Sequence, residues 1–177
     1  MTRQQAIAAL ADFAGPLGPF ESLEELLKRK EEWIVTSGRE LADALLDILI
    51  HPLDDNELRS ATRENFEGEL SEVLQLLGKR DPLPFLQTIG PYLTNPHARP
   101  TIIEVVGALG AQEGIDWLEP LLSDERLTSD ELIRLACALG EIGGDRARAL
   151  LEHMRHSYPG ETEALQREID VALQSSC

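Results

Sequence analysis

The dipeptide Leu-Gly recurs along this chain at nearly regular spacing, and this recurrence constrains the fold more than any other feature. Three of its four copies, separated by 32 and 30 residues, are Leu77-Gly78, Leu109-Gly110 and Leu139-Gly140. The positions at offsets −8, −7, −5, −4, −2 and −1 from each glycine are apolar in 17 of 18 cases, with Ser71 as the exception. Such a broad apolar surface is typical of a helix packed on more than one side. The copies therefore predict helix–turn–helix units that stack on one another.

Composition and helix-start signals predict an all-α chain. Leucine occurs 30 times and valine only 5 times. Unbranched apolar residues favour helices, whereas strands favour β-branched and aromatic residues. Ser22, Ser37 and Thr128 are each followed three residues later by glutamate, which predicts capping boxes, and Pro82 marks another helix start. We predict helices over 3–14, 22–35, 39–50, 56–77, 82–93, 98–109, 113–122, 129–140, 145–157 and 161–174.

Two segments around the Leu-Gly step carry a longer pattern. They are Ala108-Leu109-Gly110 followed by Trp117-Leu118-Glu119-Pro120-Leu121-Leu122, and Ala138-Leu139-Gly140-Glu141-Ile142-Gly143-Gly144-Asp145 followed by Leu150-Leu151. These segments resemble HEAT repeats, and more narrowly the short HEAT-like repeats named for phycobilisome lyase subunits. The resemblance covers about residues 56–157 and implies an all-α, HEAT-like α-α superhelix of stacked antiparallel helix pairs. We expect a single domain over 1–177, with an N-terminal helical cap at 1–36, repeats at 37–157 and a C-terminal capping helix at 158–177.

The charge of the chain narrows the classes of partner. It carries 32 acidic and 16 basic residues, a formal net charge of −16, and residues 1–90 and 91–177 contribute −8 each. A nucleic-acid binder needs clustered Lys and Arg, and an anionic membrane surface repels acidic chains. No apolar run approaches the ~20 residues of a membrane span, and the N-terminus lacks a secretion signal. We expect a cytoplasmic protein whose partner is neither nucleic acid nor membrane.

Candidate catalytic and metal-binding residues are few. His153 and His156 lie three residues apart after Glu152, a spacing that places them on one helical face. No second group of ligands accompanies them, and a cation near a helix C-terminus is favoured by the dipole alone. Cys137 occupies a helix-packing position of the repeat and has no evident base. We therefore expect no metal, no cofactor and no enzymatic activity.

The resemblance also indicates where a partner would bind. In HEAT-like arrays the second helix of each pair usually lines the concave face, which here corresponds to 82–93, 113–122 and 145–157. We predict a partner-binding surface with Asp116 and Glu119 on one second helix, Arg148 and Glu152 as their counterparts one repeat on, and Trp117 as an anchor. Because Trp117 shares offset +7 with Phe85 and Ala147, core filling is the favoured role for its indole, and the anchor role is the alternative.

HEAT arrays mostly serve as binding scaffolds, so we expect a non-enzymatic protein–protein interaction module. Its small size and acidity favour an inhibitor or immunity-type protein for a basic partner such as a toxin, because long-range attraction speeds such association. Two alternatives remain open. The repeat subfamily suggests a subunit of a bilin lyase-type enzyme, and a stand-alone adaptor in a larger complex fits the same features.

Overall fold

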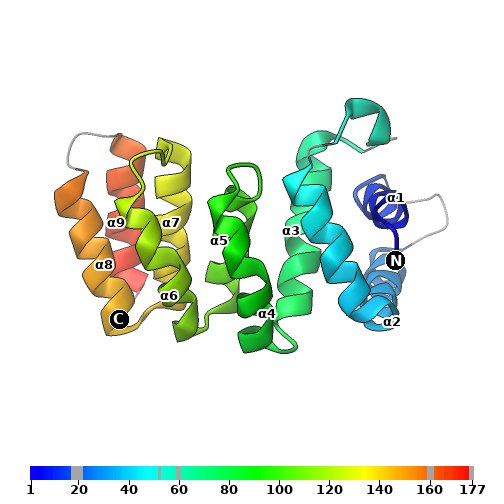
Figure 1. Ribbon diagram of the computed structural model, residues 1–177, viewed down its shortest axis with the longest axis horizontal. Coiled ribbons are helices and arrows are strands. Elements are labelled where there is room, and N and C mark those ends of the chain that lie inside the picture. The colour runs from blue at the N-terminus through cyan, green and yellow to red at the C-terminus, as the bar shows by residue number, and fades with distance from the viewer. Residues whose placement is uncertain (17–21, 52, 59–60, 159–161, 176–177) are drawn as a thin grey trace. The chain divides into compact units, whose positions relative to one another are not determined.

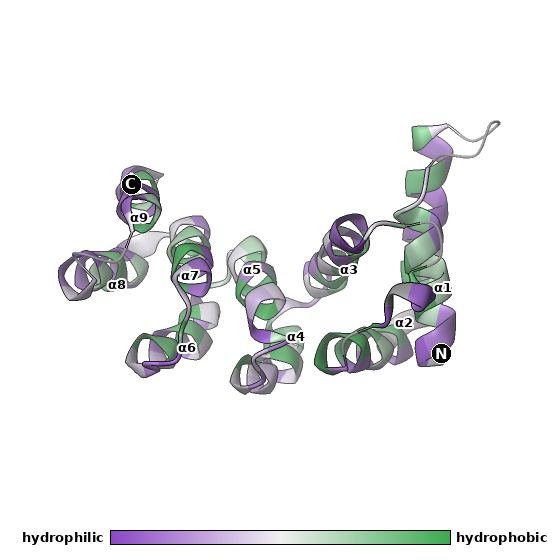
Figure 2. Cartoon of the chain, turned by 90° about the horizontal axis from the view of Figure 1, so that it is seen from above, coloured by the Kyte–Doolittle hydropathy of each residue, from purple (hydrophilic) through white to green (hydrophobic). Residues whose placement is uncertain are grey.

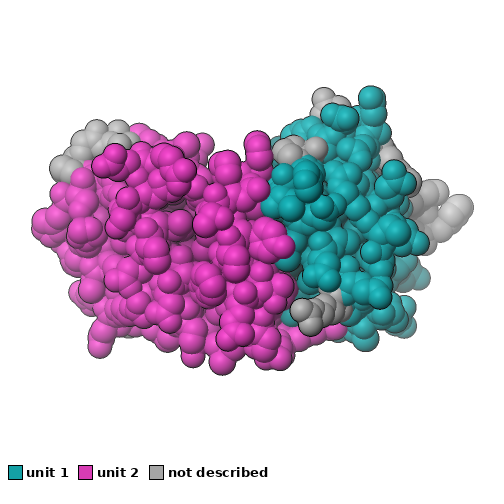
Figure 3. Space-filling model, in the orientation of Figure 1, with its two compact units in different colours: residues 1–77 teal, residues 78–177 magenta. Residues whose placement is uncertain are grey.

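The computed structural model describes residues 1–16, 22–51, 53–58, 61–158 and 162–175 (Figure 1). The chain divides into two compact units, residues 1–77 and residues 78–177, which Figure 3 colours separately. All regular structure in the described ranges is helical, which confirms the all-α prediction for them. No helix there is both long and apolar enough to cross a membrane. The single domain with helical caps stays a prediction, and each unit is described by itself.

The first unit is built from helices whose starts are fixed locally. The hydroxyl of Ser22 accepts a hydrogen bond from the amide of Glu25 at 3.2 Å, and the Glu25 carboxylate accepts from the amide of Ser22 at 2.8 Å. This arrangement confirms the predicted capping box. The rings of Phe13 and Trp33 pack with centroids 5.4 Å apart and join the first two helices. The elements of this unit are α1 (Arg3–Phe13), α2 (Leu23–Ile50), the 3-10 turn η1 (Asp55–Glu57) and α3 (Arg63–Gly78).

Helix α2 joins two of the predicted helices across a kink. Gly38 has φ 54° and ψ −140° inside it, a backbone conformation that L-residues with a Cβ rarely adopt. This non-helical residue lies where the sequence predicts the break between the helices over 22–35 and 39–50, so α2 contains two helical segments, one on either side of Gly38. The N-cap of the element is Ser22, and the capping box at Ser37 stays a prediction. Helix α3 begins seven residues later than the predicted 56, because η1 occupies residues 55–57 as a separate turn.

A buried lysine ties α2 to α3. Lys30 is 3% exposed, and its ammonium lies 2.6 Å from the Glu69 carboxylate and 3.0 Å from that of Glu72. Burial works to lower the pKa of Lys30, but the hydrogen bonds and charges of Glu69 and Glu72 outweigh it and raise that pKa above its ordinary value. The buried ammonium is thus kept charged by its two partners.

In the second unit, prolines interrupt two of the predicted helices. Pro91 and Pro120 lie at the first or second position of 3-10 segments that follow short α-helices. Because proline has no N–H to donate, it cannot continue the α-helical hydrogen bonds. The elements of this unit are α4 (Pro82–Ile89), η2 (Gly90–Thr94), α5 (Arg99–Leu109), η3 (Gln112–Gly114), α6 (Ile115–Leu118), η4 (Glu119–Ser123), α7 (Ser129–Ile142), α8 (Gly144–Ser157) and α9 (Glu163–Ser175).

Helices α5, α7 and α9 follow one another in one row, as Figure 2 shows. Small residues allow the close approach of their backbones. A Cβ on Gly107 of α5 would lie 2.6 Å from the Cα of Ala138 on α7, and one on Gly140 of α7 would lie 2.8 Å from the Cβ of Ala172 on α9. The core of the unit lies along these contacts, with Leu135 fully buried on α7.

The Leu-Gly steps do not all mark turns. Leu109 ends α5, and Gly110 follows it with φ 64°. The turn predicted at Leu139-Gly140 is wrong, because α7 continues to Ile142 and ends at Gly143, with φ 66°. Ala172 lies against Gly140 and leaves little room for a side chain at this position. The positive φ angles of the turn occur at Gly143 and Gly144.

Candidate functional site

The structure brings two of the predicted partner-binding residues to one shared arginine. Arg146, in the first turn of α8, lies 2.5 Å from the Asp116 carboxylate and also pairs with Glu119. Hydrogen bonds to Glu119 and Asp116 raise the pKa of Arg146 above its ordinary value. Sequence reasoning missed Arg146 and chose Arg148 as the counterpart. The sequence contains a pattern that could have identified Arg146, because Asp116 and Arg146 both stand six residues after the glycine of their repeat.

The other predicted residues make contacts elsewhere. The indole of Trp117 lies against Gly90, at the junction of α4 and η2. Glu152 accepts a hydrogen bond at 2.5 Å from Arg155 of its own helix, and Arg148 is exposed on α8. The structure therefore does not gather the five residues around one point, and their role in partner binding stays a prediction.

The histidines of α8 are exposed and make local contacts. His156 Nδ1 lies 2.6 Å from the backbone oxygen of Glu152, and His153 Nε2 lies 3.3 Å from the hydroxyl of Ser157. In the part of the chain that the structure describes, no group of three or more His, Cys, Asp or Glu side chains is placed to hold a metal ion.

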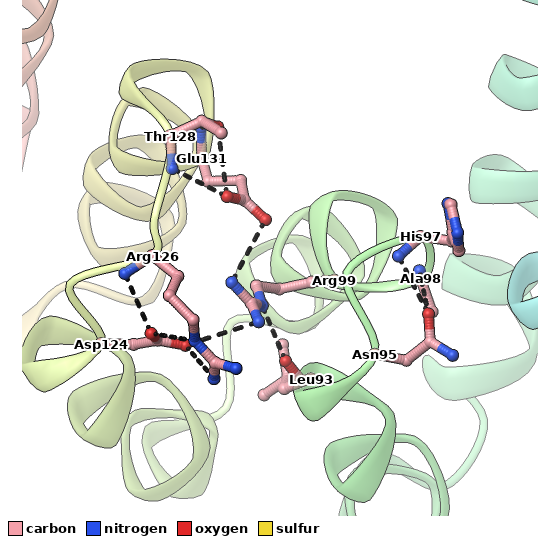
Figure 4. Close-up of polar contacts among 9 residues, drawn as sticks. All are labelled: Leu93, Asn95, His97, Ala98, Arg99, Asp124, Arg126, Thr128 and Glu131. Carbon is pink, nitrogen blue, oxygen red and sulfur yellow. Dashed lines mark hydrogen bonds and ion pairs between the residues drawn. The ribbon is translucent and has the colours of Figure 1, made fainter.

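A buried arginine, Arg99, joins several elements of the second unit. The side chain of Arg99, at the start of α5, is 4% exposed. Its Nε donates to the backbone oxygen of Leu93 at 2.9 Å, and its terminal nitrogens lie 3.4 Å from Asp124 and 3.6 Å from Glu131 (Figure 4). Asn95 positions this helix start, because its side-chain oxygen accepts from the amide of Ala98 at 3.3 Å. Arg99 thus joins η2, α5, α7 and the segment after η4.

Local motifs orient the two carboxylates toward Arg99. The amide of Glu131 donates to Thr128 Oγ1 at 3.2 Å, and Glu131 Oε2 accepts from the Thr128 amide at 2.9 Å. This confirmed capping box leaves Oε1 to face Arg99. Asp124 accepts from Arg126 Nε at 2.8 Å and from Arg126 Nη2 at 2.9 Å. These side-chain bonds, together with one from the Arg126 amide, lower the pKa of Asp124 to about 2.

A pocket of about 450 Å³ lies beside this cluster. Arg99, Arg126 and Arg134 line it together with the carboxylates of Asp130 and Glu131. Sequence reasoning singled out none of the arginines. Each stands outside the Leu-Gly repeat pattern, and only their arrangement in space shows that they share a site.

Comparison with known proteins gives a similarity that covers about half of this chain. The chain is 34% identical over 94 residues to the ribosomal RNA small subunit methyltransferase H of Cyanothece sp.. The aligned part is 53% of this chain but 27% of that methyltransferase, so this chain spans little more than a quarter of the relative's length. No protein-family model and no solved structure matches the chain.

This similarity corrects the function expected from charge and size. The relative is an enzyme by name, so the interpretation of this chain as a non-enzymatic inhibitor or immunity-type protein for a basic partner is wrong. Neither the bilin lyase-type subunit nor the stand-alone adaptor gains support from it. Acidity and small size are shared by several classes of protein, so they do not single out the inhibitor class.

Proposed function

We propose that this protein takes part in the methylation of small-subunit ribosomal RNA as a helical part of a methyltransferase. The observation that carries the proposal is the 34% identity over 94 residues to an enzyme named for that reaction. The aligned region covers 53% of this chain, which is longer than a single short motif. The described residues are helical throughout their regular structure, which suits a supporting segment of a larger enzyme.

The proposal concerns a contribution to the enzyme rather than the complete reaction. The aligned part corresponds to 27% of the relative, so other segments or chains would supply what that part does not. The net charge of −16 opposes direct contact with RNA phosphates, because such contact depends on Lys and Arg. We therefore propose that those other segments or chains bind the RNA backbone.

A HEAT-like arrangement of the helices remains part of the proposal. It is supported by the pairing of Asp116 with Arg146, which stand at the same offset in successive copies of the repeat. The similar packing of α5 on α7 and of α7 on α9 through glycine and alanine also supports it. Repeated units that contact their neighbours in equivalent ways are the defining property of helical solenoids.

Deleting the gene in its native organism tests the proposed function. Mass spectrometry of the small-subunit RNA should show the loss of a methylated nucleotide, and the wild-type gene should restore it. Two leucine variants provide matched complementation. Leu83→Ala removes a side chain that is 46% exposed and should restore methylation, whereas Leu135→Ala removes a fully buried one and should restore it poorly. An unchanged set of methylated nucleotides in the deletion strain would contradict the proposal.

A further inference from the structure

Cationic side chains are concentrated at the pocket beside Arg99. Residues 91–177 contain 15 acidic and 7 basic residues, and all seven basic residues are arginines. Three of these seven, Arg99, Arg126 and Arg134, line this one pocket. Each of the three is paired with a carboxylate, Arg99 and Arg126 with Asp124 and Arg134 with Glu104, so the pocket gathers guanidinium donors without a net excess of positive charge.

The guanidinium of Arg99 keeps donors for a further acceptor. Its terminal nitrogens are 3.4 and 3.6 Å from the carboxylates of Asp124 and Glu131. A charge-assisted hydrogen bond is shorter, about 2.7–2.9 Å. The side chain is 4% exposed, but its terminal nitrogens are not among the fully buried atoms that lack a hydrogen-bond partner. An oxygen that enters the pocket would accept from them at the shorter distance of a charge-assisted hydrogen bond.

The two other arginines also retain unused donors. Arg126 uses Nε and Nη2 for Asp124, and Arg134 uses Nη1 for Glu104. Each guanidinium carries five N–H donors in a planar fork that matches carboxylate and phosphate oxygens. Both side chains line the pocket. Their nitrogens that are not used in these ion pairs are therefore close to a ligand in the pocket.

The remaining lining limits the class of ligand. Pro96 and Pro100 give the wall an apolar part, and Asp130 and Glu131 add acceptors. The volume of about 450 Å³ falls within the range of small-molecule sites, roughly 300–1,000 Å³. Two carboxylates beside three guanidiniums favour a ligand that combines an oxyanion with hydroxyl or amino donors.

We infer that this pocket binds a small organic anion, whose carboxylate or phosphate group contacts the three arginines and whose donor groups face Asp130 and Glu131. The inference goes beyond the proposed role in RNA methylation and does not depend on it. A carboxylate and a phosphate offer guanidinium the same kind of acceptor oxygen. Binding experiments with one probe of each kind therefore distinguish the two ligand types.

Calorimetric titration of the full chain tests the site with three probes. AMP represents the phosphate source, glutamate represents the carboxylate source, and adenosine is the neutral control. We expect saturable binding of AMP or glutamate and none of adenosine. Arg126→Ala and Arg134→Ala should each weaken binding about tenfold or more, the usual effect of removing a charge-assisted hydrogen bond. Arg126→Lys should give an intermediate loss, because it keeps the charge without the planar fork.

The matched control is Arg167→Ala on α9. Arg167 is an arginine with an exposed side chain that pairs with Glu163 in the same unit but lies outside the pocket, so its removal should leave binding unchanged. The side chains of Arg126 and Arg134 are 79% and 41% exposed, so both variants should keep the wild-type circular dichroism spectrum. The absence of saturable heat with AMP and glutamate up to about 10 mM, well above a typical ligand Kd, would overturn the inference. Equal affinities for wild type, Arg126→Ala and Arg134→Ala would overturn it as well.

Discussion

The backbone of Gly90 lies directly against the indole ring of Trp117. Gly90 has φ −51° and ψ −44°, an ordinary helical conformation in which alanine is favoured over glycine. The ring, rather than the backbone, therefore explains the glycine. This contact joins the end of α4 to α6 and uses a face of Trp117 for packing inside the second unit.

Gly90→Ala should destabilise the protein by about 1–3 kcal/mol, the usual cost of forcing a methyl group into a packed core. Urea unfolding followed by circular dichroism measures the change. Gly68→Ala is the matched control, because Gly68 lies in α3 with no neighbouring atom within 4 Å of an added Cβ. It should stabilise the protein by roughly 0.5–1 kcal/mol. A Gly90→Ala protein as stable as wild type would show that the indole moves away from Gly90.

Leu135→Ala should cost roughly 2–5 kcal/mol, the range for a leucine removed from a packed core. Leu135 is 0% exposed on α7, where the row of α5, α7 and α9 has its central helix. Leu83→Ala in the same unit should change the free energy of unfolding by less than about 0.5 kcal/mol, as exposed positions do. Equal effects of the two substitutions would mean that α7 is not at the centre of the core.

The thiol of Cys137 should react slowly with alkylating reagents. Burial, followed by the hydrogen bond and charge of Glu168, raises the pKa of Cys137 from 9.0 to about 12, and the thiolate is the reactive form. At pH 8, iodoacetamide should modify Cys137 more than about tenfold more slowly in the folded than in the unfolded chain. The experiment uses a Cys177→Ser background, because Cys177 lies outside the described residues.

Two variants of α9 test the cause of this slow reaction. Glu168→Gln should speed alkylation because it removes a negative charge beside the thiol, whereas Asp170→Asn on the exposed side of α9 should not. The raised pKa also affects stability. The folded state favours the neutral thiol. The resulting contribution to the free energy of unfolding is fully present below pH 9 and is lost as the pH rises from 9 to 12. A Glu168→Gln protein that reacts at the wild-type rate would show that Glu168 does not contribute to the slow reaction.

Lys30→Met should destabilise the first unit by about 3 kcal/mol, because it leaves the carboxylate of Glu69 without its buried counter-charge. Replacing both partners, in Lys30→Met with Glu69→Leu, should recover much of that loss, since an apolar pair avoids the unpaired charge. Lys28→Met is the control at an exposed position of the same helix. A single variant as stable as wild type would mean that Glu69 is solvated without Lys30.

The starts of α2, α4 and α7 were predictable because their signals depend on neighbouring residues. Ser22 and Thr128 cap helices through glutamates three residues away, and Pro82 begins α4 as predicted. Helix ends after proline were less predictable. The predicted helices over 82–93 and 113–122 extend past Pro91 and Pro120, whereas the chain changes there from α to 3-10 geometry.

The candidate site was not predictable from the pattern of the chain. Arg99 meets Asp124 and Glu131, which lie 25 and 32 residues further along. Apolar periodicity identifies faces of helices, but it does not reveal which polar side chains meet across them. Only equal offsets from the repeat glycines leave a trace in the sequence, as for Asp116 and Arg146, which each stand six residues after such a glycine.

Because Lys30 is buried between α2 and α3, the rate at which its amine is acylated reports how often the two helices separate. The chain has three lysines, Lys28, Lys30 and Lys79, and only Lys30 is buried. Acetic anhydride should modify Lys28 and Lys79 at once. Lys30 should become acetylated only as fast as the two helices part, because its ammonium must first leave Glu69 and Glu72. Peptide mass spectrometry of a timed acylation would then give an opening rate for the first unit without any introduced label.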